Sequence, residues 1–280
     1  MDEGQVSVNG LVMGRDTSYR VNEFNPWNRA IRAEATGANP WSDGGWSGAE
    51  FYEPVTVEFK VRTQGANATD WQQLHWQLTQ AFAPIRTALT EYELRWVTAG
   101  VEYLMYGRPR SLSPTVARLR TGQVAETASF YCPDPAIYSG AEHVVTIGLP
   151  DWTGGLTVPV VTPATVAATQ TDGVATVTNA GNVAARLLLR ITGPVTDPSV
   201  TVIDTDGIAL TLTIETTLGP DDWIDVDTAE RSVILNGSVS RLADAWGSWP
   251  LLYPGTSTIR YAAADHNDLT RLTIRWRDQW

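Results

Sequence analysis

Alternation of apolar and polar residues with a period of two is the sequence feature that most restricts the fold. In residues 55–62, Val, Val, Phe and Val alternate with Thr, Glu, Lys and Arg. Successive side chains of a strand point to opposite faces of its sheet, so this pattern predicts a half-buried antiparallel strand. Residues 187–191, 208–215 and 271–276 repeat the pattern. The chain is therefore expected to be mainly β.

One helix is expected in the first half. Its apolar residues recur at helical spacing: Trp71, Leu74, Leu78 and Phe82. Asp70 belongs to the residue types that cap helix N-termini, and Pro84 ends the segment. A single helix among strands predicts a β-sandwich or barrel-like domain with one helical insertion.

The second half is punctuated by turn sequences at intervals typical of short strands. Asp206-Gly207 and Asn236-Gly237 supply the positive φ that tight hairpins need. About nine strands are expected, which is enough for a jelly-roll-like β-sandwich.

A domain junction is expected where the composition changes between the two halves. Residues 149–163 are low in charge and interrupted by Pro. A chain of 280 residues exceeds the usual size of one domain. We therefore expect an N-terminal domain over residues 1–150 and a C-terminal domain over residues 151–280.

A Gly-, Pro- and Trp-rich segment at residues 37–48 has no periodicity, which predicts a long loop or a hairpin tip. It contains Trp41 and Trp46. Two interpretations stay open for these side chains. They fold back onto their own domain, or they anchor an interface with a neighbouring subunit, as aromatic residues often do.

Charge and targeting signals limit the partners. The formal net charge is −11, which opposes binding to a phosphate backbone, so no nucleic-acid partner is expected. The first residues are acidic and polar and predict no secretory signal. No apolar run approaches the roughly 20 residues that span a bilayer. The chain is expected to fold in the cytosol without membrane insertion.

No residue pattern predicts catalysis, a cofactor or a metal site. Cys132 is the only cysteine and is expected to be a small buried hydrophobe. The aspartates between residues 204 and 227 do not have the spacing of a calcium loop, because Gly207 follows Asp206 directly. They are expected in turns and on solvent-facing surfaces. His75 lies on the expected helix and is predicted to be a surface or interface residue.

Short motifs in a fixed order give the chain a resemblance to a known family. They are NAG at 179–181, LGPDDWIDVD at 218–227, RSVILNG at 231–237 and WPLLYPG at 249–255. FYCPDPAIYS at 130–139 precedes them in the first half. In this order the segments resemble siphophage distal tail proteins, over nearly the whole chain.

The resemblance implies a structural protein of the virion tail tip and no enzyme. In that family, an N-terminal β-domain forms a ring of six copies beneath the tail tube. A galectin-like or carbohydrate-module-like sandwich projects from the ring. The implied partners are the tail tube protein, the end of the tape-measure protein and the tail-tip hub protein, with assembly in the host cytoplasm.

A second function stays open for the C-terminal domain. Trp246, Trp249 and Tyr253 are aromatic residues that could stack on sugar rings of host cell-wall glycans. The alternative for these three residues is core packing and closure of strand ends.

Overall fold

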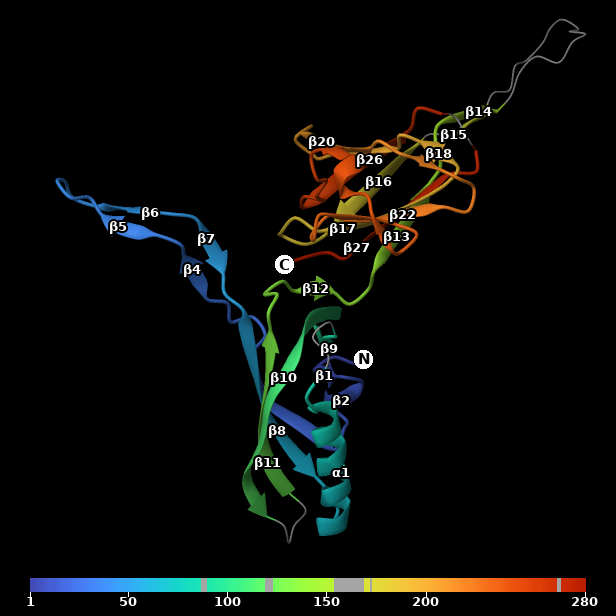
Figure 1. Cartoon of the computed structure of the whole chain (residues 1–280). Coiled ribbons are helices and arrows are strands. Elements are labelled where there is room, and N and C mark those ends of the chain that lie inside the picture. Colours follow the sequence, from blue (N-terminus) through green and yellow to red (C-terminus); the bar gives the residue numbers. More distant parts are fainter. Residues whose placement is uncertain (87–89, 119–122, 154–168, 172, 266–267) are drawn as a thin grey trace, which may run out of the picture. The chain divides into compact units, whose positions relative to one another are not determined.

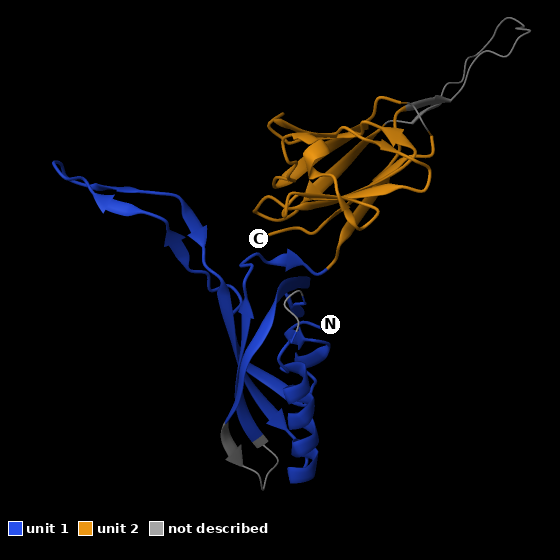
Figure 2. Cartoon of the chain, in the orientation of Figure 1, with its two compact units in different colours: residues 1–140 blue, residues 141–280 orange. Residues whose placement is uncertain are grey.

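The computed structural model in Figure 1 is mostly β, and the mainly β prediction is confirmed. It describes residues 1–86, 90–118, 123–153, 169–171, 173–265 and 268–280. The chain divides into two compact units, Met1–Gly140 and Ala141–Trp280 (Figure 2).

The division between the units falls earlier than the expected boundary at residue 150. The reason is strand β13 (His143–Ile147), which pairs along its whole length with the last strand, β27 (Arg271–Trp276). Residues 154–163, most of the Pro-punctuated stretch expected at the junction, lie outside the described residues.

The first unit is built on one antiparallel sheet with the strand order β2-β1-β9-β10-β11-β8-β3, and β12 pairs with β10. The strands are β1 (Gln5–Val8), β2 (Leu11–Gly14), β3 (Tyr19–Phe24), β8 (Val55–Gln64), β9 (Tyr92–Thr98), β10 (Val101–Arg118), β11 (Gln123–Cys132) and β12 (Tyr138–Ser139). The outermost strands β2 and β3 also contact each other, so the sheet curls into a barrel-like form. The predicted barrel-like domain with one helix is confirmed.

Strand β10 joins two parts of this sheet by changing its partner. Its first half pairs with β9 and its second half with β11. The change occurs at Gly107, where an added Cβ would collide with the carbonyl oxygen of Tyr131 and the ring of Phe130. A residue without a side chain is therefore required where the strand crosses over.

The clearest sequence pattern is found as expected in β8. Its side chains alternate between buried and exposed along all ten residues. Phe59 packs its ring against Phe24 and Phe82, the latter from the end of the helix. The alternation thus separates the core of the first unit from its solvent face.

The helix α1 (Ala68–Ala81) begins with a different cap from the one predicted. Asn67, not Asp70, is the N-cap, and its side chain accepts a hydrogen bond from the Asp70 backbone N–H at 2.9 Å. The Asp70 carboxylate accepts from the Ala66 N–H at 2.7 Å. Two N–H groups at the helix start are satisfied in this reciprocal way.

The second unit is a sandwich of two antiparallel sheets. One has the order β13-β27-β17-β22-β23-β24 and the other β16-β26-β19-β20-β25. Besides β13 and β27, the strands are β16 (Val174–Asn179), β17 (Leu187–Thr192), β19 (Ser199–Ile203), β20 (Ala209–Ile214), β22 (Trp223–Asp227), β23 (Ser232–Leu235), β24 (Val239–Ser240), β25 (Ala245–Gly247) and β26 (Gly255–Ala262). Short ladders β14–β15 (Asp151–Thr153, Thr169–Thr171) and β18–β21 (Val195–Thr196, Thr217–Leu218) accompany them.

The apolar core of the second unit lies between these sheets. Leu187, Leu189 and Ile191 of β17 are buried there, as the alternation predicted, and so are Leu272 and Ile274 of β27. The predicted sandwich is confirmed.

One part of the alternation pattern is misleading. Ile208 was expected to share the buried face with Leu212 and Ile214, but 58% of its surface is exposed. It precedes β20 and belongs to the turn held by Asp204, whose side chain accepts a hydrogen bond from the Ile208 N–H at 2.8 Å.

Candidate functional site

A two-stranded ribbon leaves the main sheet of the first unit between β3 and β8, and we call its residues 30–53 the arm (Figure 1). It consists of β4 (Ile31–Ala33) paired with β7 (Glu50–Tyr52), followed by β5 (Thr36–Ala38) paired with β6 (Gly45–Ser47). The hydrogen bonds Glu34 N–H to Ala49 O at 2.9 Å and Gly48 N–H to Ala35 O link the two ladders into one ribbon.

The arm exposes large apolar side chains along its whole length. At least half of the surface of each is accessible: Ile31, Trp41, Trp46, Phe51 and Tyr52. A two-stranded ribbon has no second layer in which to bury them, and it is marginally stable alone in water. Concentrated exposed apolar surface of this kind marks interaction sites.

Of the two tryptophans expected in this segment, Trp41 projects furthest into solvent. It lies in the hairpin tip between β5 and β6, and 97% of its surface is exposed. Trp46 is 55% exposed and lies across Gly37, where a Cβ would approach its Nε1 to 2.8 Å. The segment is thus a hairpin tip, and Trp41 does not fold back onto its own domain.

An aromatic cluster that the sequence analysis missed lies at the base of the arm. Trp27 meets Trp96 edge-on at 5.7 Å between ring centroids and Tyr103 at 5.2 Å. Phe24 also contacts Trp96, at 5.7 Å. These four residues come from β3, β9, β10 and the connection to the arm, so only the fold brings them together.

A groove of about 310 Å³ lies beside this cluster. Its lining comes from β3 and its extension and from the chain around β1 and β9: Gly4, Gln5, Val6, Val21, Asn22, Phe24, Pro26, Trp27, Trp96, Val97 and Thr98. Trp96 is 2% exposed, and its Nε1–H is one of the buried donors without a hydrogen-bond partner among the described residues. An unmade hydrogen bond at a buried donor is costly, so Trp96 carries an energetic penalty in the free chain.

His75, expected at the surface or in an interface, keeps 23% of its side chain exposed, and its Nδ1 lies 3.0 Å from Glu126 Oε2. The Glu126 side chain has no exposed surface and also accepts a hydrogen bond from Thr63 Oγ1 at 3.1 Å. Tyr19 contributes a second anchor by donating its hydroxyl hydrogen to Leu74 O at 2.9 Å. Burial, and secondarily the Glu126 charge, raise the pKa of Tyr19 to about 12.

In the second unit, the three aromatic residues considered for glycan binding lie in different surroundings. Trp246 is 59% exposed on β25, the edge strand of its sheet. Trp249 packs against the core between the sheets, and Tyr253 is partly exposed. No ring contact joins any two of them in the part of the chain that the structure describes.

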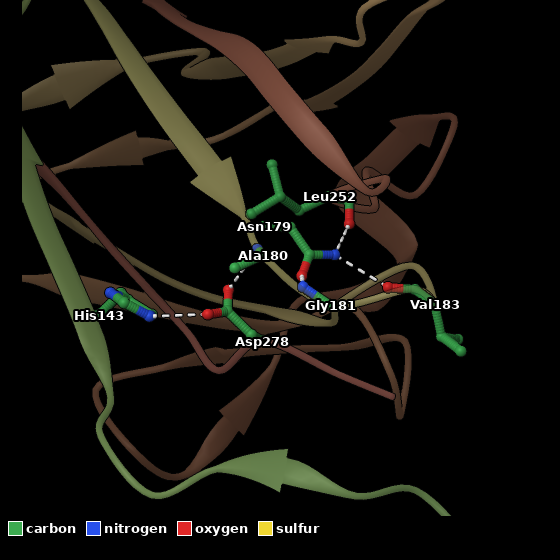
Figure 3. A network of polar contacts seen from close by, with 7 residues as sticks. All are labelled: His143, Asn179, Ala180, Gly181, Val183, Leu252 and Asp278. Atoms are coloured by element: carbon green, nitrogen blue, oxygen red, sulfur yellow. Dashed lines mark hydrogen bonds and ion pairs between the residues drawn. The ribbon is translucent and has the colours of Figure 1, made fainter. Parts of the chain in front are cut away.

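A buried polar network ties the end of the chain to the loop after β16 (Figure 3). The Asn179 side chain donates to Val183 O at 2.8 Å and Leu252 O at 2.9 Å, and accepts from the Gly181 N–H at 2.9 Å. Asp278 accepts from the Ala180 N–H at 3.1 Å, and its other oxygen lies 3.2 Å from His143 Nε2. The NAG motif is therefore an anchor for the C-terminal residues.

The aspartates weighed as calcium ligands serve turns and an ion pair instead. Asp204, Asp222 and Asp227 accept backbone N–H bonds in their own turns, and Asp225 pairs with Arg190 at 2.6 Å. Hydrogen bonds from Asn236 and the Gly219 N–H lower the pKa of Asp222. Within the described ranges, no group of three or more His, Cys, Asp or Glu residues is arranged to hold a metal ion. None of the described helices is long and apolar enough to cross a membrane.

Comparison with known proteins agrees with this architecture. Residues 180–280, most of the second sandwich, match the family model described as siphovirus-type tail component, C-terminal domain. This stretch is similar to the C-terminal domain of siphovirus-type tail components. The match to this tail component domain begins at the anchor loop after Asn179 and runs to the last residue. A search of curated proteins found no match.

Solved structures extend the likeness to the whole chain. The crystal structure of SPP1 Dit (gp 19.1), described as a paradigm of the hub adsorption apparatus in phages infecting Gram-positive bacteria, has a TM-score of 0.63 and 14% identity. The alignment covers 99% of this chain and 98% of that chain. The phage P2 baseplate in its activated conformation matches at a TM-score of 0.50 with Ca and 0.51 with Sr, at 12% identity each. These alignments cover 97% of this chain and 97% and 96% of those chains.

At these identities the structural likeness shows the fold. Together, the tail component domain and the fold of the whole chain confirm the predicted resemblance to siphophage distal tail proteins.

Proposed function

We propose that the protein is a structural subunit of a siphophage tail tip and that its first unit assembles into a ring between the tail tube and the tail-tip hub. The observation that carries the proposal is the end-to-end fold likeness to SPP1 Dit together with the tail component domain. The ring would contain six copies, as the family resemblance implies. Its other partners would be the tail tube protein, the end of the tape-measure protein and the hub protein.

The arm supports assembly independently of the likeness. Its exposed aromatic residues lie on a ribbon that cannot bury them within one chain. The arm and the remaining surface of the first unit are different surfaces, so a contact between them is heterologous. Heterologous contacts close into rings when the rotation between neighbours divides a full turn.

A non-enzymatic role is part of the proposal. The buried polar groups of both units serve to hold structure: His75 and Glu126 fix α1 to the sheet, and Asn179 fixes its loop to Leu252. The acidic net charge also fits a protein that does not bind the DNA backbone. The protein would reside in the virion tail tip after assembly in the host cytoplasm.

A carbohydrate-binding role for the second unit remains the alternative function, and one observation favours it. Trp246 exposes a large flat ring on an edge strand, where a sugar could stack on it. Trp249, which was considered with it for glycan binding, is partly buried against the core.

The mass of the purified full chain in solution tests the proposal. Light scattering should give a mass of about six chains, and negative-stain images of the same sample should show closed rings. A protein that stays monomeric at high concentration and instead co-sediments with host cell walls would favour the glycan-binding alternative. A Trp246→Ala variant that loses the cell-wall binding would then assign it to β25.

A further inference from the structure

The tip of the arm exposes a large aromatic side chain, and the groove beside Trp96 has apolar walls that could bury one. We propose, building on the ring of the proposed function, that the arm of one copy inserts Trp41 into the groove of a neighbouring copy. The Trp41 indole would lie among Trp27, Phe24 and Trp96. The receiving residues and the inserted residue then belong to two different chains in every contact of the ring.

The arm cannot place its tip in the groove of its own chain. Trp27 and Pro26, at the base of the arm, line the groove, whereas Trp41 lies beyond both ladders. Residues 30–38 rise about 3.3 Å each along a paired strand, so the tip lies roughly 25 Å from the base. The continuous backbone pairing holds the ribbon extended. The tip can therefore reach this groove only in another molecule.

The apolar chemistry of the two surfaces matches. Trp41 is the most exposed large apolar side chain in the described parts of the chain, at 97%. The groove offers it aromatic and aliphatic walls, among them Phe24, Trp27 and Val97. Aromatic rings gain stabilisation when they pack edge to face with other rings beyond the burial of their area. A tryptophan that fills a pocket is the kind of residue that dominates interface energies.

The polar chemistry of the two surfaces matches as well. The Nε1–H of Trp96 is buried and lacks an acceptor. In the tip, the closing hydrogen bonds among the described residues are Asn39 N–H to Gly44 O at 3.0 Å and Asn39 Nδ2 to Asp43 O at 3.4 Å. These bonds leave the carbonyl groups of Pro40, Trp41 and Ser42 available as acceptors. A bond from one of them to Trp96 would require the groove walls to part around the indole, because its Nε1 has almost no accessible surface in the free chain.

Directed disulfide formation tests the contact. Ser42 and Asn22 are both exposed, and Asn22 lines the groove. Full-length S42C is mixed with full-length N22C under mild oxidation. A disulfide-linked dimer of the mixture is expected, with little dimer from either variant alone. The double variant S42C/N22C should give a ladder of multimers ending in a closed ring.

Matched controls exclude chance encounters and misfolding. S238C places an exposed thiol on the second unit and should cross-link to S42C at least tenfold more slowly than N22C does. Adding Trp41→Ala to S42C should slow cross-linking by about tenfold or more without changing the melting temperature, because Trp41 makes little contact in the free chain. Cys132 is buried in all variants and does not compete.

The outcomes separate this contact from the ring itself. Rings seen by light scattering without a 42–22 cross-link would overturn the groove contact and leave the proposed function standing. Cross-linking of S42C to a purified hub protein instead of to N22C would also overturn it. Chains that neither assemble nor cross-link at the highest attainable concentration would contradict both proposals.

Discussion

The Glu126 carboxylate lies 3.0 Å from His75 Nδ1 and has no exposed surface, so the helix of the first unit is fixed to its sheet by a buried ionisable pair. Glu126 occupies a core-facing position of β11, in register with Val61 of β8. A carboxylate is tolerated there because Thr63 and His75 supply its two hydrogen bonds.

Removing the histidine should destabilise the first unit strongly. In His75→Ala, the buried Glu126 carboxylate keeps the hydrogen bond from Thr63 and loses the one to the histidine. Removing one member of a buried pair lowers the free energy of unfolding by about 3 kcal/mol or more. Urea unfolding of the full chain, followed by tryptophan fluorescence, measures the change. Lys60→Ala is the matched control, because its ion pair with Glu23 is more than half exposed on both sides and should contribute less than about 1 kcal/mol. Equal losses in the two variants would contradict the assigned role of the buried pair.

How much of the first unit the sequence predicts depends on where its side chains point. The alternation in β8 is strict because one face is core and the other is solvent. The arm shows no such pattern, because both faces of its short strands are exposed and no burial selects apolar residues at alternate positions. Trp41 and Trp46 stood out by residue type, whereas Trp27 and Trp96 lie far apart in the sequence and meet only after folding.

In the second unit too, the sequence predicts the strands and turns but not the contacts that form only on folding. Its strands and turns follow from alternation and from Asp-Gly and Asn-Gly signals, as at Asn236-Gly237, where both residues have positive φ. In the sequence, the NAG motif indicated a family resemblance but no physical role. Its physical role needs two residues that tertiary packing brings near: Leu252, which the Asn179 side chain binds, and Asp278, which the Ala180 N–H binds. The division after Gly140 could not be predicted from the sequence either. It depends on the pairing of β13 with β27, the last strand, which lies more than 100 residues later in the chain.

The loop after β16 should be sensitive to loss of the Asn179 amide. Asn179 is 1% exposed and makes three hydrogen bonds, so Asn179→Ala leaves the Val183 carbonyl and the Gly181 N–H without these partners, while the Leu252 carbonyl keeps the Ala185 N–H. A loss of about 2–3 kcal/mol in the unfolding free energy is expected. Asn182→Ala, which changes an exposed side chain in the same loop, should alter stability by less than about 0.5 kcal/mol. Calorimetry of both variants checks this, and similar melting temperatures would argue against the anchor.

Alkaline pH should weaken the first unit through Cys132. Burial, assisted by the charges of Glu91 and Asp134, raises the pKa of this thiol from 9.0 to about 12. The unfolded chain releases its thiol proton above pH 9 while the folded chain retains it. The stabilising contribution is therefore complete below pH 9 and is lost as pH rises toward 12, at about 1.4 kcal/mol per pH unit.

Urea unfolding at several pH values between 8 and 11 measures this loss. Cys132→Ala lowers the stability at every pH because it leaves a cavity, but its stability should fall less steeply above pH 9 than that of the natural chain. Tyr19, whose pKa is also raised, continues to contribute above pH 10 in both proteins. The same slope in both proteins between pH 9 and 10 would show that the thiol does not titrate as expected.

Truncation of both arm tryptophans should separate assembly from folding. Trp41 and Trp46 are more than half exposed, so Trp41→Ala/Trp46→Ala should leave the melting temperature of the dilute monomer within about 2 °C. A tryptophan that anchors an interface contributes about 2 kcal/mol or more, so the subunit affinity should fall at least roughly 30-fold. Light scattering over a concentration series measures the shift. Trp246→Ala removes an indole about as exposed as that of Trp46 from the second unit and should leave the ring unchanged. A double variant that assembles as readily as Trp246→Ala would show that the arm carries no assembly contact.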